Sequence, residues 1–119
     1  MSRKLDAAIA EALGYKAIPG LGLCVFVKEY EDHRGLVADR WVQRNDGVLP
    51  HYSTDGNAML ELDAEMRARG WQLETAFWGN VHFARFCHGQ PQGSMCAEKL
   101  PKAVALAAYK ALTGKEWAG

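Results

Sequence analysis

The stretch from His51 to Phe86 constrains the fold more than any other part of the chain, because a polar cap, a helix, a glycine and a hairpin follow one another in it. Ser53, Thr54 and Asp55 are residue types that cap helices. An apolar stripe at helical spacing comes next, formed by Met59, Leu62 and Met66. The sequence therefore predicts an amphipathic helix that begins near residue 55.

A two-stranded hairpin is predicted directly after this helix. Gly70 follows Arg67 and Arg69 and is a natural helix stop, since glycine accepts positive φ without a Cβ penalty. Residues 71–78 and 81–87 alternate loosely between apolar and polar, and Gly79-Asn80 between them is a dipeptide typical of tight hairpin turns.

The rest of the chain adds two helices and two strands by the same criteria. The expected segments are a helix over 3–13 ended by Gly14, a strand over 21–27, a charged loop or hairpin tip over 28–34, a strand over 35–43, a flexible loop over 88–95, and an alanine-rich helix from Pro101 to Gly114. Helices separated by antiparallel strands predict a single α+β domain over 1–119, a helix/antiparallel-sheet layered sandwich of about three helices and four strands.

Composition narrows the class of protein. Fourteen basic residues balance fourteen acidic ones in 119 residues, which argues against a binder of nucleic-acid polymers and permits self-association. Three cysteines without a regular spacing favour a reducing compartment, and no apolar run is long enough to cross a membrane. The expectation is a soluble protein of the cytoplasm that makes no membrane contact.

Four segments resemble one known family. IAEALGY at 9–15, PHYSTD at 50–55, GWQLETAFWGNVHFARF at 70–86 and LPKAVALAAYKAL at 100–112 are similar to segments of the phage ABA-sandwich domain family of small uncharacterised bacteriophage proteins. Residues 28–48 are longer than the family pattern. The resemblance implies a helix/sheet sandwich and a phage origin, with the host cytosol as location. Small phage proteins of this kind include oligomers that sequester nucleotide immune signals of the host.

The Tyr-Ser-Thr-Asp run at 52–55 has two interpretations. In the first, Tyr52 packs beside the helix and the next three side chains cap it. In the second, hydroxyls and free amides at the helix start receive a phosphate or another anion. The carboxylate of Asp55 weighs against the second interpretation, whereas Gly56 would allow an anion to approach the backbone.

Tryptophans and arginines offer a further binding hypothesis. Trp71 and Phe77 are expected in the core. Trp78 is expected to be half exposed at the hairpin tip, where it or Trp41 could stack on a base while arginines neutralise phosphate. The predicted ligand-binding residues are His51, Tyr52, Ser53, Thr54, Trp78, Trp41, Arg40 and Arg85.

Metal binding and catalysis have weaker signals. His82, Cys87, His88 and Cys96 lack the paired spacing of a zinc site. His33, His51 and His82 could act as bases, but the common motifs of nucleophilic or metal-dependent catalysis are missing. We therefore predict no metal, no cofactor and no catalytic residue.

The leading hypothesis is a non-enzymatic phage accessory protein that forms homo-oligomers and binds a small anionic or nucleotide-like ligand, as an anti-defence sponge. The first alternative is a protein-binding module that docks on a host protein through Trp78 or the alanine-rich helix. The second alternative is a small phosphoester hydrolase.

Overall fold

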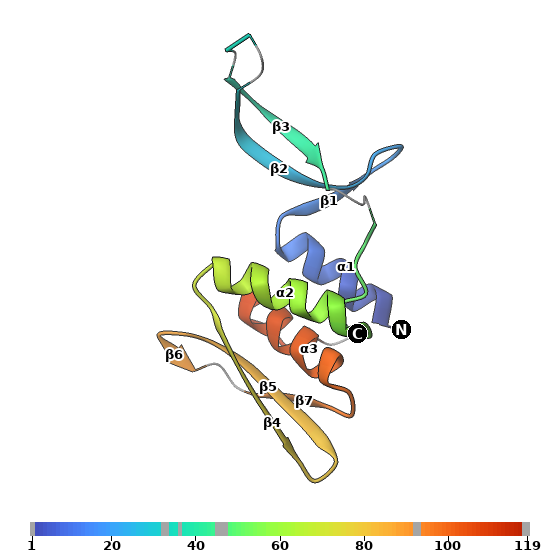
Figure 1. Ribbon diagram of the computed structural model, residues 1–119, viewed down its shortest axis with the longest axis vertical. Coiled ribbons are helices and arrows are strands. Elements are labelled where there is room, and N and C mark those ends of the chain that lie inside the picture. Colours follow the sequence, from blue (N-terminus) through green and yellow to red (C-terminus); the bar gives the residue numbers. More distant parts are fainter. Residues whose placement is uncertain (1, 32–33, 36, 45–47, 92–93, 118–119) are drawn as a thin grey trace. The chain divides into compact units, whose positions relative to one another are not determined.

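The computed structural model of the chain describes residues 2–31, 34–35, 37–44, 48–91 and 94–117 (Figure 1). His33, a candidate base from the sequence, lies outside this part of the chain. The described chain divides into two compact units, Met1–Ile9 with Pro50–Gly119, and Ala10–Leu49. Each unit is described by itself below, and the single domain over 1–119 stays a prediction.

Helices and antiparallel strands alternate along the chain, which confirms the α+β class. In chain order the elements are α1 (Ser2–Ala12), β1 (Tyr15–Ile18), β2 (Gly22–Glu31), β3 (Val37–Gln43), α2 (Gly56–Ala68), β4 (Gln72–Trp78), β5 (Val81–His88), β6 (Gln90–Pro91), β7 (Met95–Ala97) and α3 (Leu100–Thr113).

The sheet of the larger unit is built around β5. Strand β4 pairs with β5 in an unbroken antiparallel register from Gln72 opposite Cys87 to Trp78 opposite Val81. The short strands β6 and β7 pair with the other side of β5, so β4 forms one edge of the sheet. Gly79 and Asn80 have φ values of 63° and 69°. Two consecutive positive φ angles characterise the type I′ turn, whose twist matches the hairpin strands.

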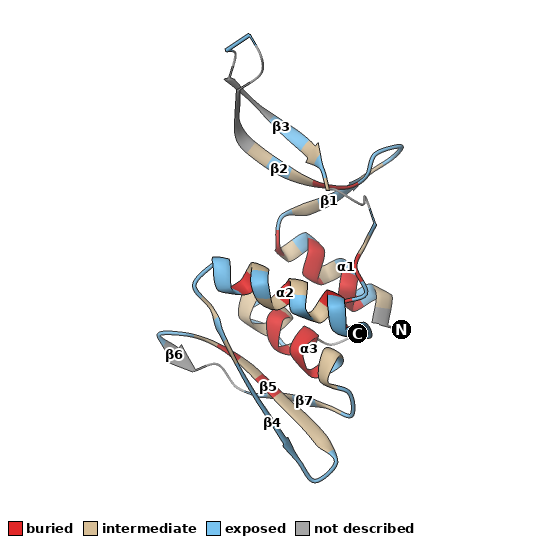
Figure 2. Ribbon diagram, viewed as in Figure 1, coloured by how far each residue is buried: buried red, intermediate tan, exposed pale blue. Residues whose placement is uncertain are grey.

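Two helices cover one face of this sheet. Helix α3 packs on β5 and β7, and α2 packs on α3 and β4. The contact side of α3 is made of small residues, all of them buried: Ala103, Val104, Ala105, Ala107 and Ala108. Figure 2 shows buried residues gathered on the helices and on β5, whereas β4 is exposed along most of its length. The alanine-rich side of α3 therefore serves the core of the unit.

The smaller unit holds an antiparallel sheet in the order β1-β2-β3. Strands β2 and β3 pair from Cys24 opposite Gln43 to Glu31 opposite Val37, with a register shift between Val27 and Tyr30. A shift of this kind adds local twist to a long hairpin.

Three parts of the predicted fold were wrong. The described residues contain more strands than the four expected, because β1, β6 and β7 were missed. Residues 28–31, predicted as a loop or hairpin tip, continue β2, since pairing with β3 outweighs their charged composition. Residues 88–95, predicted as a flexible loop, include β6 and the first residue of β7. Both of these strands pair with the central strand β5.

Candidate functional site

The start of α2 is closed by its own side chains. Asp55 is the N-cap residue, and its carboxylate Oδ1 accepts a hydrogen bond from the amide of Asn57 at 3.3 Å. The amides of Thr54 and Asp55 both donate to the carbonyl oxygen of His51, at 3.1 Å and 2.9 Å. Of the two interpretations of this run, capping thus accounts for the observed contacts.

Asp6 of α1 supplies an acceptor that the sequence did not reveal. Its side chain is fully buried, and Oδ1 accepts a hydrogen bond from the amide of Ser53 at 2.9 Å. Arg3 donates from Nη1 to Oδ2 of Asp6 at 3.1 Å and to the carbonyl oxygen of Pro50 at 3.1 Å. An internal carboxylate therefore already holds the amide that a bound anion would need.

The predicted ligand residues at the start of α2 differ in how far they are buried. Tyr52 and Ser53 are buried, and His51 and Thr54 are exposed. Two carboxylates, those of Asp6 and Asp55, receive amide hydrogen bonds here. Because like charges repel, the same carboxylates disfavour a phosphate at this position. Ligand binding at 51–54 stays a prediction of the sequence.

The tip of the β4–β5 hairpin carries the most exposed aromatic side chains among the described residues. Trp78 is 80% exposed and Phe77 is 62% exposed. The prediction that Phe77 lies in the core was wrong. Its side chain points to the helix-covered side of the sheet, as the pairing with His82 indicates, but the hairpin end extends past α3 (Figure 1). The His82 ring lies beside it, at 4.5 Å between ring centroids.

An ion pair lies on the opposite face of the hairpin. Arg85 Nε donates to Oε1 of Glu74 at 2.5 Å, and the thiol of Cys87 donates to the same oxygen at 3.4 Å. These hydrogen bonds, first from Arg85 and then from Cys87, lower the pKa of Glu74, and the carboxylate raises the pKa of Arg85 in return. The predicted ligand residue Arg85 is thus engaged with a carboxylate of the neighbouring strand.

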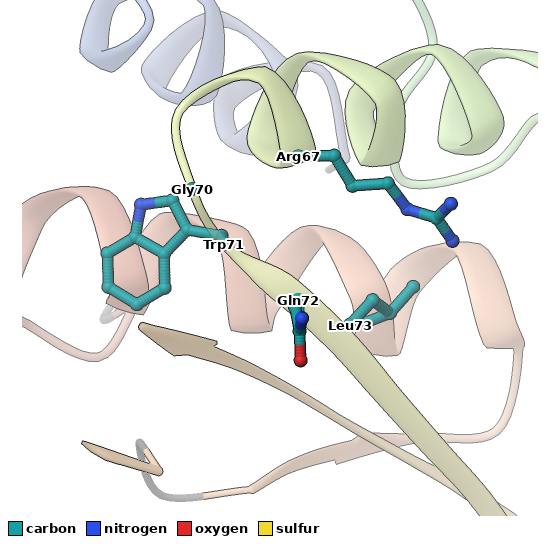
Figure 3. A pocket seen from close by; sticks show the side chains of 5 residues that line it. All are labelled: Arg67, Gly70, Trp71, Gln72 and Leu73. Carbon is teal, nitrogen blue, oxygen red and sulfur yellow. The ribbon is translucent and has the colours of Figure 1, made fainter. Parts of the chain in front are cut away.

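A hollow lies at the junction between the end of α2 and the start of β4. It has a volume of about 480 Å³ and is lined by Arg67, Gly70, Trp71, Gln72 and Leu73. Figure 3 shows Arg67 and Leu73 on one side of β4 and the Trp71 ring on the other side. Arg67 makes an ion pair with Asp63 one helical turn away, at 3.1 Å. The hollow thus combines a cation, an indole ring and an aliphatic side chain at the edge of the sheet.

Trp41 and Arg40 belong to the smaller unit, whereas the other predicted residues belong to the larger unit. Trp41 packs against Phe26 of β2 with ring centroids 5.0 Å apart, and Lys16 Nζ lies 5.6 Å from the Trp41 ring. Arg40 is adjacent to Trp41 in β3, so the two side chains point to opposite faces. In the smaller unit, therefore, Trp41 and Arg40 do not share a face of the sheet.

The thiols differ in exposure: Cys24 is buried, Cys87 is intermediate and Cys96 is exposed. Within the described part of the chain, no group of three or more His, Cys, Asp or Glu side chains is placed to hold a metal ion. In the same residues, none of the helices is both long and apolar enough to span a bilayer.

No protein-family model, curated protein or solved structure matches this chain. The resemblance to the phage ABA-sandwich family stays an expectation from the sequence.

Proposed function

We propose that this protein is a non-enzymatic binding module that docks a strand of another protein chain along β4. The observation that carries the proposal is the exposure of Trp78 and Phe77, at 80% and 62%, at the end of an edge strand. Tryptophan is the residue type most enriched among the anchors that dominate protein interfaces. An open strand edge supplies the backbone hydrogen bonds for a partner strand.

The two edges of this sheet differ in a way that supports β4 as the docking edge. Proteins usually protect edges with short strands, proline, lysine or bulges. The β6 and β7 side consists of two- and three-residue strands and includes Pro91. Strand β4 has seven residues in unbroken register, without proline or lysine, and its only charge, Glu74, is paired with Arg85. The β4 edge thus lacks the common protection.

In this proposal, the helix/sheet sandwich predicted from the sequence is the scaffold that carries the docking edge. Helices α2 and α3 pack on one side of the sheet, and the hairpin extends beyond them. Because the docking strand is already formed and paired with β5, less conformational entropy is lost when a partner docks.

Photo-crosslinking in producing cells tests the docking function. A benzophenone amino acid replaces Trp78 in one variant and Leu21, an exposed apolar residue of the smaller unit, in a control variant. We expect a protein adduct of one defined mass from position 78, with the attachment point in an extended segment of the partner. Adducts no stronger at position 78 than at position 21 would overturn the proposal.

A second candidate function is suggested by the hollow beside α2. Arg67 and the Trp71 ring are the types of groups that hold a phosphate and a base, and the volume of about 480 Å³ is in the range of small-ligand sites. In this version the protein sequesters a nucleotide-like signal of the host, as a phage accessory protein would.

Native mass spectrometry of gently purified protein tests the second candidate. The expected result is a bound small molecule at fixed ratio to the subunits, lost in an Arg67→Ala variant but retained in Arg69→Ala, which changes a neighbouring exposed arginine. A protein that carries no small molecule when isolated from phage-infected or prophage-bearing cells would exclude it.

A further inference from the structure

We propose that the strand docked on β4 is β4 of a second copy of this chain, paired antiparallel about a two-fold axis at Thr75. This inference rests on the proposed docking function and names its partner. It follows from the direction of the backbone groups of β4, from the side chains that one register places opposite each other, and from the hollow beside it.

The hairpin turn fixes which backbone groups of β4 are directed outward. A two-residue turn makes Trp78 and Val81 a hydrogen-bonded pair, and such pairs alternate along an antiparallel ladder. Gln72, Glu74 and Ala76 therefore also exchange hydrogen bonds with β5. The N–H and C=O groups of Leu73, Thr75 and Phe77 are directed away from β5, toward the open edge.

Only one register of two identical strands uses all of these groups. With Thr75 opposite its own copy, Leu73 of one chain is opposite Phe77 of the other, and about six backbone hydrogen bonds form between the chains. All seven residues of β4 then have a partner. Moving the axis to Glu74 would place two carboxylates opposite each other, which is unfavourable. Moving it to Ala76 would leave Gln72 and Leu73 without partners.

Side-chain complementarity supports the same register. Phe77 and Leu73 project to the same side of the sheet, since both have the parity of Thr75. In the Thr75-centred pair, Phe77 of each copy is directed at Leu73 of the other, beside the hollow that Leu73 and Arg67 line (Figure 3). An aromatic ring that is 62% exposed in one chain would there be covered by apolar and cationic neighbours.

Charge also permits close approach of two copies. The formal net charge of the chain is zero, and the single charged side chain of β4 is neutralised by Arg85. Self-repulsion is therefore weak at this edge, in contrast to edges that lysines keep apart.

Substitutions of opposite charge at Thr75, which lies on the proposed two-fold axis, test this inference. Thr75 is exposed, so lysine or glutamate at this position leaves the fold of one chain intact, which circular dichroism and the melting temperature would verify. In the dimer, two copies of residue 75 lie about 5 Å apart. Sedimentation velocity of purified protein at micromolar concentration should give a dimer for the wild-type chain and for Thr75→Ser.

Thr75→Lys and Thr75→Glu should each be monomeric alone, with dimer affinity reduced by about 100-fold, because like charges face each other. An equimolar mixture of the two variants should restore a one-to-one dimer. A monomeric wild-type chain would overturn the inference, and so would a dimer that survives both substitutions.

The two proposals fail in different ways. A position-78 adduct with a different protein, together with a monomeric purified chain, would overturn the second-copy inference and retain the docking function. Adducts at position 78 no stronger than at position 21 would overturn the docking function itself.

Discussion

Replacing Asp6 by alanine tests the account of the α2 start most directly. The substitution removes the acceptor of the Ser53 amide, which is buried with its residue, and an unsatisfied buried N–H costs about 1–3 kcal/mol. Arg3 also loses its carboxylate, but its side chain is 41% exposed, so solvent screening limits that part to less than about 1 kcal/mol. The expected loss in the free energy of unfolding is therefore about 1–4 kcal/mol.

Urea unfolding followed by circular dichroism measures this loss. With a denaturant slope of about 2 kcal/mol per M, typical of small proteins, the midpoint should fall by about 0.5–2 M. Asp6→Asn keeps one acceptor oxygen for the Ser53 amide and should lose only about half as much. Asp63→Ala is the control, because Asp63 also pairs with an arginine on its own helix. That arginine, Arg67, is 68% exposed, so the loss of the pair should cost less than about 0.5 kcal/mol. Equal losses for Asp6→Ala and Asp63→Ala would refute the reasoning.

Two further predictions concern the junction and the face of the hairpin. Gly70 has a φ of 91°, and a Cβ there would lie 2.7 Å from Nε2 of His88, so Gly70→Ala should destabilise by about 2 kcal/mol, and by less in a His88→Ala background. Urea titration of the four chains would measure both costs, and identical costs in both backgrounds would show that His88 yields freely. The pKa of Glu74 is lowered in the folded chain, so its stabilising effect is present above the unfolded pKa and is lost as pH falls through the folded value. Carboxyl NMR should show the Glu74 pKa rising in Arg85→Met, and an unchanged titration would contradict the role of the ion pair.

Local signals predicted the elements whose ends are set by neighbouring residues. The α2 helix has Asp55 as cap and Gly70 after its end, and the turn at Gly79-Asn80 fixes the hairpin. These features depend on interactions within a few residues, which a sequence displays directly. Strand β1, by contrast, has only four residues, and its pairing with β2 determines its conformation.

The candidate site could be predicted in part. The sequence placed Trp78 at a hairpin tip, and the structure exposes it there. The sequence did not predict the role of Asp6, because the hydrogen-bond partner of this side chain, Ser53, lies 47 residues away. Phe77 was assigned to the core from its residue type alone, since the alternation of a strand identifies its face but not how far the helices extend over it.

Because the three thiols differ in exposure, their reaction rates with a thiol reagent can report local unfolding of the chain. Cys24 is buried in the smaller unit, and Cys96 is exposed on β7 of the larger unit. A thiol reagent should modify Cys96 at once and Cys24 only when the β1-β2-β3 sheet opens. The rate at which Cys24 itself is modified, resolved from Cys87 and Cys96 by peptide mapping, then reports local opening of the smaller unit in the native chain, without any mutation or attached probe.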